Sequence, residues 1–95
     1  MTVLEKEIER KLKTLVERHA GLCLKWVCPG WLGVPDRIVL LPGGRIVFVE
    51  LKRPQGGRLS PMQIWWGRKL KGLGFRYWTL WDQEDLDDFE KGVLL

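Results

Sequence analysis

Two short apolar runs joined by Pro42-Gly43-Gly44 constrain the fold of this chain more than any other feature. The runs cover residues 38–41 and 46–49, and in both of them apolar side chains occupy the two alternating faces of a strand. Strands that are apolar on both faces lie inside a sheet and are covered by helices on either side. The sequence therefore predicts a central β-hairpin within an α/β sandwich.

The remaining elements are predicted from hydrophobic periodicity and from capping residues. An apolar stripe over residues 3–19 indicates a helix that Gly21 ends. The other expected elements are strands at residues 22–27, 36–41, 45–52 and 75–81, a helix at 61–71 and a short acidic helix after Asp82. The order is α-β-β-β-α-β-α, and a chain of 95 residues has room for one domain, residues 1–95, around one modest core.

Register decides whether two carboxylates, Asp36 and Glu50, meet across this hairpin. A two-residue turn would place them on opposite faces of the sheet, whereas a three-residue turn over residues 42–44 sets Asp36 directly opposite Glu50. Proline at the second turn position, and a glycine free to adopt the left-handed conformation, favour the three-residue turn. With this register Asp36, Glu50 and Lys52 share one face, at the end of the sheet away from the turn.

Three ionisable groups in that position indicate a divalent-metal nuclease site. Two carboxylates so close repel each other unless one is protonated or a cation lies between them, and oxygen ligands select a hard ion such as Mg²⁺ or Mn²⁺. Lys52 could orient the attacking water or stabilise the charge that builds up on phosphorus. The alternative is structural: Asp36 starts a strand after Pro35, while Glu50 and Lys52 form a surface ion pair.

The middle of the chain is far more basic than the formal net charge of +4 indicates, since residues 37–76 hold nine Lys or Arg against one Glu. A polyanionic partner fits this pattern, although charge that merely keeps the surface soluble would look the same. Nothing among these residues resembles a base-reading helix, so we expect recognition of DNA by shape. The candidate phosphate contacts are Lys25, Arg37, Arg53, Arg58, Arg68, Lys69 and Lys71.

Three short segments of the chain carry a recognisable pattern. They are residues 33–40, 49–52 and 59–63. Together they resemble the signature of the VRR-NUC domains within the PD-(D/E)XK nuclease superfamily, and the similarity extends from the first helix to the last strand. The resemblance implies a restriction-endonuclease-like core with a central mixed sheet flanked by helices. It also implies that Asp36, Glu50 and the Leu51 carbonyl bind Mg²⁺ or Mn²⁺, and that Lys52 is the catalytic lysine.

The family also carries a glutamate on its first helix, for which Glu5 and Glu9 are the candidates. Glu5 falls inside the apolar stripe and Glu9 at its edge, so we choose Glu5 as a further metal ligand. Thr2 to Glu5 is also a capping box, in which the glutamate would simply reach back to a backbone amide. Gln63 has the same ambiguity, because it completes a capping box yet the resemblance places it near the scissile phosphate as a catalytic residue.

Six tryptophans exceed what a core of this size can bury. Trp65 and Trp66 are adjacent on their helix, so one of them is expected to face outward. Such residues form either a dimer interface or a platform for base stacking, and we favour the interface. Stand-alone VRR-NUC proteins resemble enzymes that resolve Holliday junctions as homodimers, in which two sites cut two strands symmetrically.

The resemblance thus implies a homodimeric, metal-dependent endodeoxyribonuclease for branched DNA, Holliday junctions above all, acting in DNA repair. Alternatives are a nuclease for flaps or other branched structures, a nuclease directed at RNA, or a non-catalytic DNA-binding subunit with the same fold. Cys23 and Cys28 are expected on opposite faces of one strand, which predicts no disulfide. No apolar stretch approaches the length of a membrane span. We expect a cytoplasmic protein of a bacterium or phage, without an organic cofactor.

Overall fold

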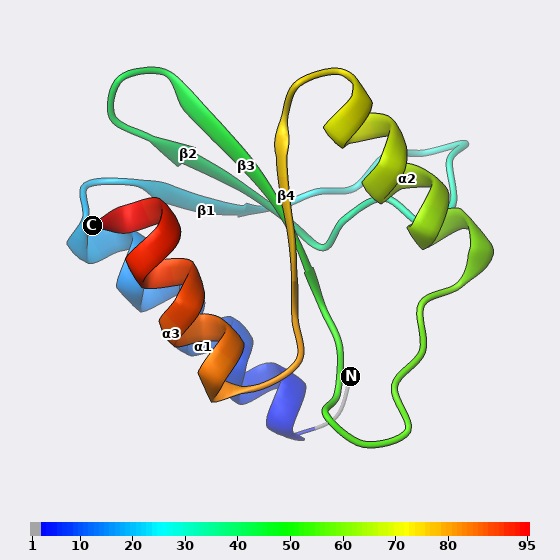
Figure 1. Ribbon diagram of the computed structural model, residues 1–95, viewed down its shortest axis with the longest axis horizontal. Helices are drawn as coiled ribbons and strands as arrows, with labels where there is room; N and C mark the ends of the chain where they lie inside the picture. Colours follow the sequence, from blue (N-terminus) through cyan, green and yellow to red (C-terminus); the bar gives the residue numbers. More distant parts are fainter. Residues whose placement is uncertain (1–2) are drawn as a thin grey trace.

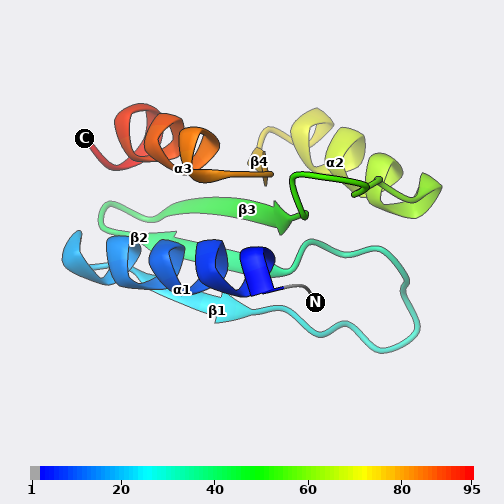
Figure 2. The same cartoon turned by 90° about the horizontal axis from the view of Figure 1, so that it is seen from below.

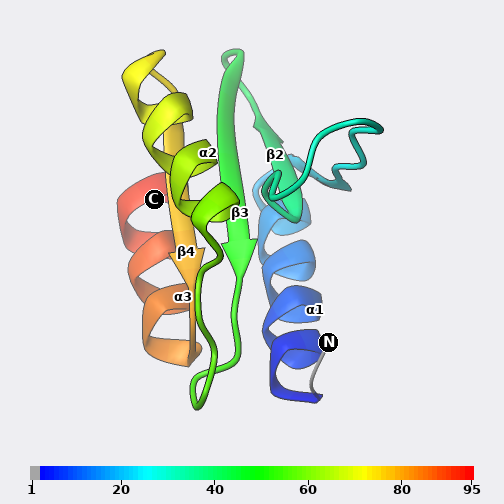
Figure 3. The same ribbon diagram turned by 90° about the vertical axis from the view of Figure 1, so that its right-hand side faces the viewer.

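The computed structural model describes residues 3–95, which fold around a mixed sheet of four strands in the order β1-β2-β3-β4. β1 (Leu22–Lys25), β2 (Arg37–Leu41) and β3 (Arg45–Leu51) are antiparallel neighbours. β4 (Arg76–Leu80) pairs with β3 in parallel, and Figure 3 shows the two strands running in the same direction. The mixed sheet is the one that the sequence predicted.

Helices lie on both faces of this sheet. α1 (Val3–Arg18) and α3 (Gln83–Phe89) share one face, with α1 packed on β1 and α3 beside β4, whereas α2 (Pro61–Gly72) lies on the other (Figures 1 and 2). A π-helical turn, η1 (Glu90–Leu94), extends α3. Parallel neighbours need a crossover connection, and α2 lies within the one that joins β3 to β4. The order α-β-β-β-α-β-α and the flanked sheet confirm the predicted fold class.

The apolar core lies between the sheet and the α1–α3 layer. Alternate residues of β2 and β3 point into it, as the period of two in a strand requires, and one stripe of α1 meets them. Its best-buried members, all below 3% exposed, are Leu12, Val16, Val39, Val47, Val49, Leu51, Leu80, Phe89 and Val93. This face of the sheet therefore holds the interior that stabilises the fold.

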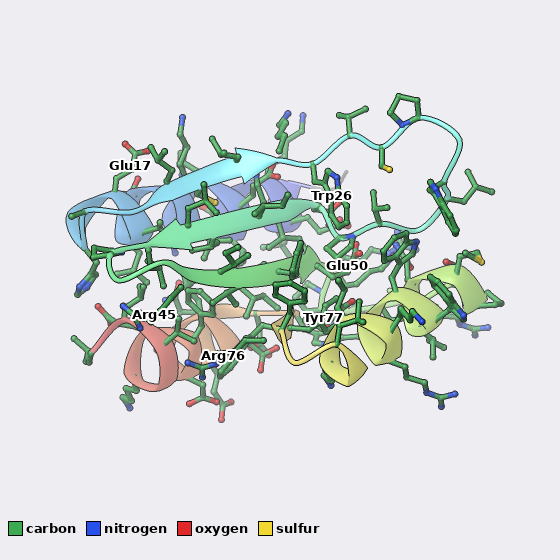
Figure 4. The ribbon with its side chains drawn as sticks, turned by 90° about the horizontal axis from the view of Figure 1, so that it is seen from above. Glu17, Trp26, Arg45, Glu50, Arg76 and Tyr77 are labelled. Atoms are coloured by element: carbon green, nitrogen blue, oxygen red, sulfur yellow. The ribbon has the colours of Figure 1, made fainter. Side chains whose placement is uncertain are left out.

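The face that carries α2 is only partly covered. Phe48 is 8% exposed, whereas Leu22, Leu24 and Ile46 on the same face are 56%, 44% and 38% exposed. Figure 4 looks onto this face: α1 lies behind β1 and β2, and α2 lies to one side of them. The expectation that helices cover both faces of the hairpin thus holds fully on one face and only in part on the other.

The hairpin has the predicted register. Leu41 pairs with Arg45 across a three-residue turn, and Arg37 pairs with Val49 at the other end. Gly43 and Gly44 both have positive φ, 82° and 73°, a region that glycine enters without steric cost. The left-handed conformation predicted for Gly44 is confirmed, and Gly43 adopts one as well.

Local signals placed the other elements to within a few residues. α2 begins with the predicted capping box, in which the Ser60 side chain accepts a hydrogen bond from the backbone N–H of Gln63. Asp82 is the N-cap of α3, as predicted. β1 is shorter than expected and ends at Lys25, so Cys28 lies in the following loop rather than in the strand. Both cysteines are free thiols. Within residues 3–95, no helix combines the length and the apolar character needed to cross a membrane.

Candidate functional site

Asp36 and Glu50 meet where β2 begins and β3 approaches its end. The pairing of Arg37 with Val49 puts Asp36 opposite Glu50, and their carboxyl groups are in hydrogen-bonding contact. One oxygen of Asp36, Oδ2, also accepts a hydrogen bond of 2.8 Å from the backbone N–H of Leu51. The glutamate is only 2% exposed. The hairpin thus fixes two acidic side chains side by side, one of them almost fully buried.

Burial strongly perturbs Glu50. Its pKa rises from 4.5 to about 9, chiefly because burial removes hydration from the charged form and then because of the hydrogen bond and the negative charge of Asp36. The positive charge of Lys52 opposes this shift, and Glu5 adds to it. Among the described residues, Oε2 of Glu50 is the one buried side-chain oxygen or nitrogen atom that has no hydrogen-bond partner. Without a cation, this carboxyl group is therefore protonated at neutral pH.

Gln63 reaches the carboxylate pair from α2 and also caps that helix. Its side-chain oxygen accepts a 2.8 Å hydrogen bond from the backbone of Ser60, as in a capping box. Its Nε2 donates a 3.3 Å hydrogen bond to Oε1 of Glu50. The hydrogen bond to Ser60 fixes the side-chain amide of Gln63, and this amide in turn orients Glu50.

The two candidate glutamates of the first helix, Glu5 and Glu9, have different surroundings. Glu9 is bound to the guanidinium of Arg37 at 3.0 Å, so its carboxylate is committed to an ion pair. Glu5 is half-buried and close enough to influence the charge of Glu50. Among residues 3–95, however, no three His, Cys, Asp or Glu side chains converge closely enough to hold one ion. The proposed cap of Glu5 by Thr2 involves a residue outside those that the structure describes.

The donors at this site suit a hard divalent cation. Asp36 and Glu50 present adjacent carboxylate oxygens, and the unpartnered Oε2 of Glu50 is a buried acceptor that a cation would satisfy. A cation would also replace the proton that burial otherwise keeps on Glu50. Leu51, whose N–H holds Asp36, is the neighbouring residue whose carbonyl we predicted as a third ligand.

Arg37 corrects one predicted role. Its side chain is buried, 8% exposed, because it lies on the same face of the strand as Val39 and Leu41 and so points toward α1. Its guanidinium bonds Glu9 and, at 3.0 Å, the carbonyl of Cys23. The prediction that Arg37 contacts DNA phosphate is wrong, since the group is used to lock α1 to β1 and β2.

The other basic candidates are exposed and flank the carboxylates on two sides. Lys25 lines a groove together with Lys6, Trp26 and Asp36. Arg68 and Lys71 line a second groove with Gln63 and Tyr77, on the opposite side of the pair. Arg53 and Arg58 lie on the exposed loop after β3, where Arg53 bonds the carbonyl of Gly56 at 3.2 Å.

Tyr77 is a residue of the site that sequence reasoning missed. It lies on β4 opposite Phe48, and its neighbour on the same face, Thr79, lies opposite Glu50. Burial raises the pKa of Tyr77 and the charges of Glu50 and Asp36 add to this, although a hydrogen bond with Thr79 lowers it. Figure 4 shows Trp26, Glu50 and Tyr77 close to the junction of loop, sheet and α2. The parallel register that brings Tyr77 here leaves no mark in the sequence.

Comparison with known proteins finds the same architecture among nucleases. The chain is 42% identical over 91 residues to "Putative nuclease p44" of Acyrthosiphon pisum secondary endosymbiont phage 1, and the match covers 96% of each protein. A solved structure described as a VRR_NUC domain superposes with a TM-score of 0.90 at 25% identity. That match covers 97% of this chain and 99% of the other. No family model matches the sequence.

Proposed function

Because this chain belongs to the VRR-NUC family of nucleases, we propose that it is a Mg²⁺- or Mn²⁺-dependent endonuclease that hydrolyses phosphodiester bonds in branched DNA. Residues 1–95 would form one nuclease domain, and a homodimer would cut two strands of a Holliday junction. The observation that carries the proposal is the buried pair of Asp36 and Glu50, in which one carboxylate oxygen has no partner. Such a pair is stable in its ionised form only when a cation lies between the two groups.

Asp36, Glu50 and the Leu51 carbonyl would hold the cation. Bound there, it would supply a Lewis acid for water and for a phosphate oxygen. The protein fixes the geometry beforehand, since the N–H of Leu51 orients Asp36 and the amide of Gln63 orients Glu50. To hold a cation, Glu50 would have to be in its ionised form, so its proton would leave to solvent.

Lys52 supplies a positive charge beside this pair. It follows Glu50 by two residues, so both side chains project from the same face of the chain, and its charge favours the ionised form of the glutamate. Negative charge builds up on the phosphate oxygens during hydrolysis, and a fixed ammonium group stabilises it. We assign Lys52 this catalytic role, with Gln63 as the residue that positions Glu50. Glu5 would adjust the site's charge from α1 without contacting the ion.

The exposed basic residues support a path for DNA across the site. Lys25 lies on one side of the carboxylates and Arg68 on the other, so a phosphate backbone could pass between them over Asp36. Arg53 and Arg58 extend the basic surface along the loop after β3. Contacts of this kind position DNA without reading its sequence, which suits a nuclease that selects structure.

The open part of the α2 face supports a homodimer. Leu22, Leu24, Ile46 and Phe75 are 56%, 44%, 38% and 39% exposed, and together they present on the order of 300 Å² of apolar side chain. That area could form the apolar centre of an interface of roughly 800 Å² per partner. Replacing Ile46 with Asp should then produce monomers in analytical ultracentrifugation, whereas Leu4→Asp, on exposed α1 surface, should leave the dimer intact.

Cleavage of three substrates tests the proposal: a four-way junction, a flap and an unbranched duplex, each with Mg²⁺, with Mn²⁺ and with EDTA. We expect metal-dependent cutting of the branched substrates only, and loss of cutting with retained DNA binding in Asp36→Ala and Glu50→Ala. Normal cutting by either variant would remove the proposed site. Faster cutting of the flap would favour a flap nuclease.

A non-catalytic DNA-binding subunit is the competing reading. It predicts no heat of Mn²⁺ binding in calorimetry and no cleavage of any substrate, with DNA binding preserved. The structure favours the nuclease, because a protein without metal chemistry gains nothing from keeping Glu50 buried with an unpartnered oxygen.

A further inference from the structure

The loop between β1 and β2 carries an exposed aromatic surface at its outer end. Trp31 is 53% exposed and Leu32 is 78% exposed. The Trp31 ring stacks on the ring of Trp65 from α2, with centroids 6.1 Å apart and planes at 15°. Trp66 meets both rings edge-on, at 5.5 Å and 5.2 Å. We name this surface, formed by Trp31, Leu32 and Trp65, the tryptophan step.

The tryptophan step is held in place rather than left to move. The indole N–H of Trp66 donates a 2.9 Å hydrogen bond to the Leu32 carbonyl. Gly33, at φ +77°, approaches α2 so closely that an added Cβ would lie 2.6 Å from the Cβ of Met62. Only glycine fits this contact. An exposed aromatic group that the fold holds rigidly is a preformed binding surface, since little conformational entropy remains to be lost on contact.

The tryptophan step is also coupled to the carboxylate site. Gly33 packs on the first turn of α2, and the next residue of that turn, Gln63, bonds Glu50. On the other side, the loop runs through buried Pro35 directly into Asp36. The loop therefore packs against the helix turn that carries Gln63 and leads directly into Asp36, and Figure 4 shows Trp26 at its start close to Glu50.

We propose that the tryptophan step stacks on the exposed base pair at a branch point of DNA and so selects branched substrates, an inference that rests on the proposed nuclease function. Inside an uninterrupted duplex every base pair is stacked on both sides, so a flat ring finds a free base-pair face only where strands separate or end. Stacking of bases on aromatic side chains is insensitive to sequence. Trp31 offers one ring face to the DNA while Trp65 supports the other.

The charges around the step favour DNA as the occupant over a second copy of the chain. Trp65 borders a shallow hollow that is also lined by Arg68 and Lys69. A phosphate backbone would neutralise both groups. A twofold interface centred here would instead bring the same two cations of each subunit toward one another, which disfavours association. The sequence alone had favoured an interface for the exposed tryptophans; the placement of these cations favours stacking.

The proposal fixes where the strand is cut. Asp36 follows Trp31 by five positions, and a segment of that length spans at most about 17 Å. At about 3.4 Å per nucleotide along a strand, this distance corresponds to roughly five nucleotides. Cleavage should therefore fall within about five nucleotides of the branch, at a defined position.

The test compares Trp31→Ala with Trp31→Phe, which keeps a flat ring, and with Leu4→Ala as a control that removes an exposed apolar side chain from α1. Binding to a forked DNA and to an unbranched duplex of equal length is measured by fluorescence anisotropy in an Asp36→Asn background with Mg²⁺. We expect Trp31→Ala to weaken fork binding about tenfold, with duplex binding changed less than about twofold. Trp31→Phe should retain most of the preference for the fork, and the control all of it.

Mapping of cut positions by the otherwise wild-type enzyme completes the test. Trp31→Ala should scatter or abolish the cut near the branch, and Leu32→Ala provides a second variant if the first does not fold. Equal binding losses on fork and duplex, no loss at all, or conversion of Trp31→Ala to a monomer would each overturn the stacking proposal. Absence of metal-dependent cleavage in the wild type would instead overturn the proposed nuclease function.

Discussion

The two faces of the central sheet use the same strands for opposite purposes. The face under α1 and α3 is closed, and its apolar side chains leave almost no surface exposed. The face under α2 contains a buried carboxyl group with a raised pKa, aromatic rings in contact with one another and a stretch of open strand. Because strand residues alternate between the faces, one hairpin can supply both a core and a site. Along β2 and β3, the odd-numbered residues therefore face the core, and the even-numbered residues face the site.

Glu50→Gln tests this separation with the largest expected effect. The change removes a metal ligand while keeping the shape of the side chain, so cleavage should fall on the order of a thousandfold or more. Thermal stability in EDTA at pH 8 should stay the same or rise, since a neutral amide needs no proton to be buried. Cleavage assays and thermal melts check the two halves; a large loss of stability would show that the α2 face also carries the fold.

Phe89→Ala probes the closed face. The ring is fully buried and packs edge-on against Trp78 at 5.5 Å, so its loss leaves a cavity. We expect the free energy of unfolding to fall by about 3–5 kcal/mol in urea titrations. Leu95→Ala, at a position that is 79% exposed, is the matched control and should cost under about 0.5 kcal/mol. A small effect at Phe89 would mean that the core can collapse around the missing ring.

The difference in the pH dependence of stability between the wild type and Glu50→Gln should report on Glu50. Its pKa is 4.5 when exposed and about 9 in the fold, so the folded state binds a proton that the unfolded chain has lost between these values. The glutamate's contribution to stability is therefore complete below about pH 4.5 and is lost as pH rises through about 9. We expect the melting temperature in EDTA to fall over this range relative to Glu50→Gln. Saturating Mg²⁺ should reduce the fall, because bound cation stabilises the ionised group; identical curves for both proteins would contradict the assignment.

Gln63 allows a finer distinction, because one amide serves both helix α2 and the site. Gln63→Glu keeps an oxygen for the cap but removes the N–H that donates to Glu50, whereas Gln63→Ala removes both contacts. Both variants should lose cleavage by about tenfold. Only Gln63→Ala should also lose cap stability, about 1 kcal/mol in urea titrations. If Gln63→Glu cuts DNA normally, the residue is a cap and nothing more.

Much of the site could be predicted because the strand register that forms it is set by a local turn. The Pro42-Gly43-Gly44 turn sets the register, and the register alone brings Asp36 opposite Glu50. Arg37 shows how a prediction failed although the signal was present. Residues two apart on a strand share a face, so Arg37 lies on the core face together with Val39 and Leu41. The prediction of a surface cation did not take this alternation into account.

Other features had no local signal. The position of Tyr77 beside the carboxylates depends on the parallel register of β3 and β4, which are joined through a whole helix. The ion pair that engages Glu9 depends on Arg37, which reaches it from another element. The open strand surface near Ile46 appears only once α2 is seen to cover part of its face. Each of these depends on contacts between residues far apart in the chain, which periodicity cannot encode.

The sequence by itself determined the element order, the three-residue turn and the shared face of Asp36, Glu50 and Lys52, since these follow from side-chain alternation and turn chemistry within about twenty residues. Only the tertiary structure decided what surrounds that pair. It buried Glu50 enough to raise its pKa, tied it to Gln63, withdrew Arg37 from the surface and stacked Trp31 on Trp65. The physical reason is that burial and electrostatics depend on every element packed nearby, whereas register depends only on the strand and its turn.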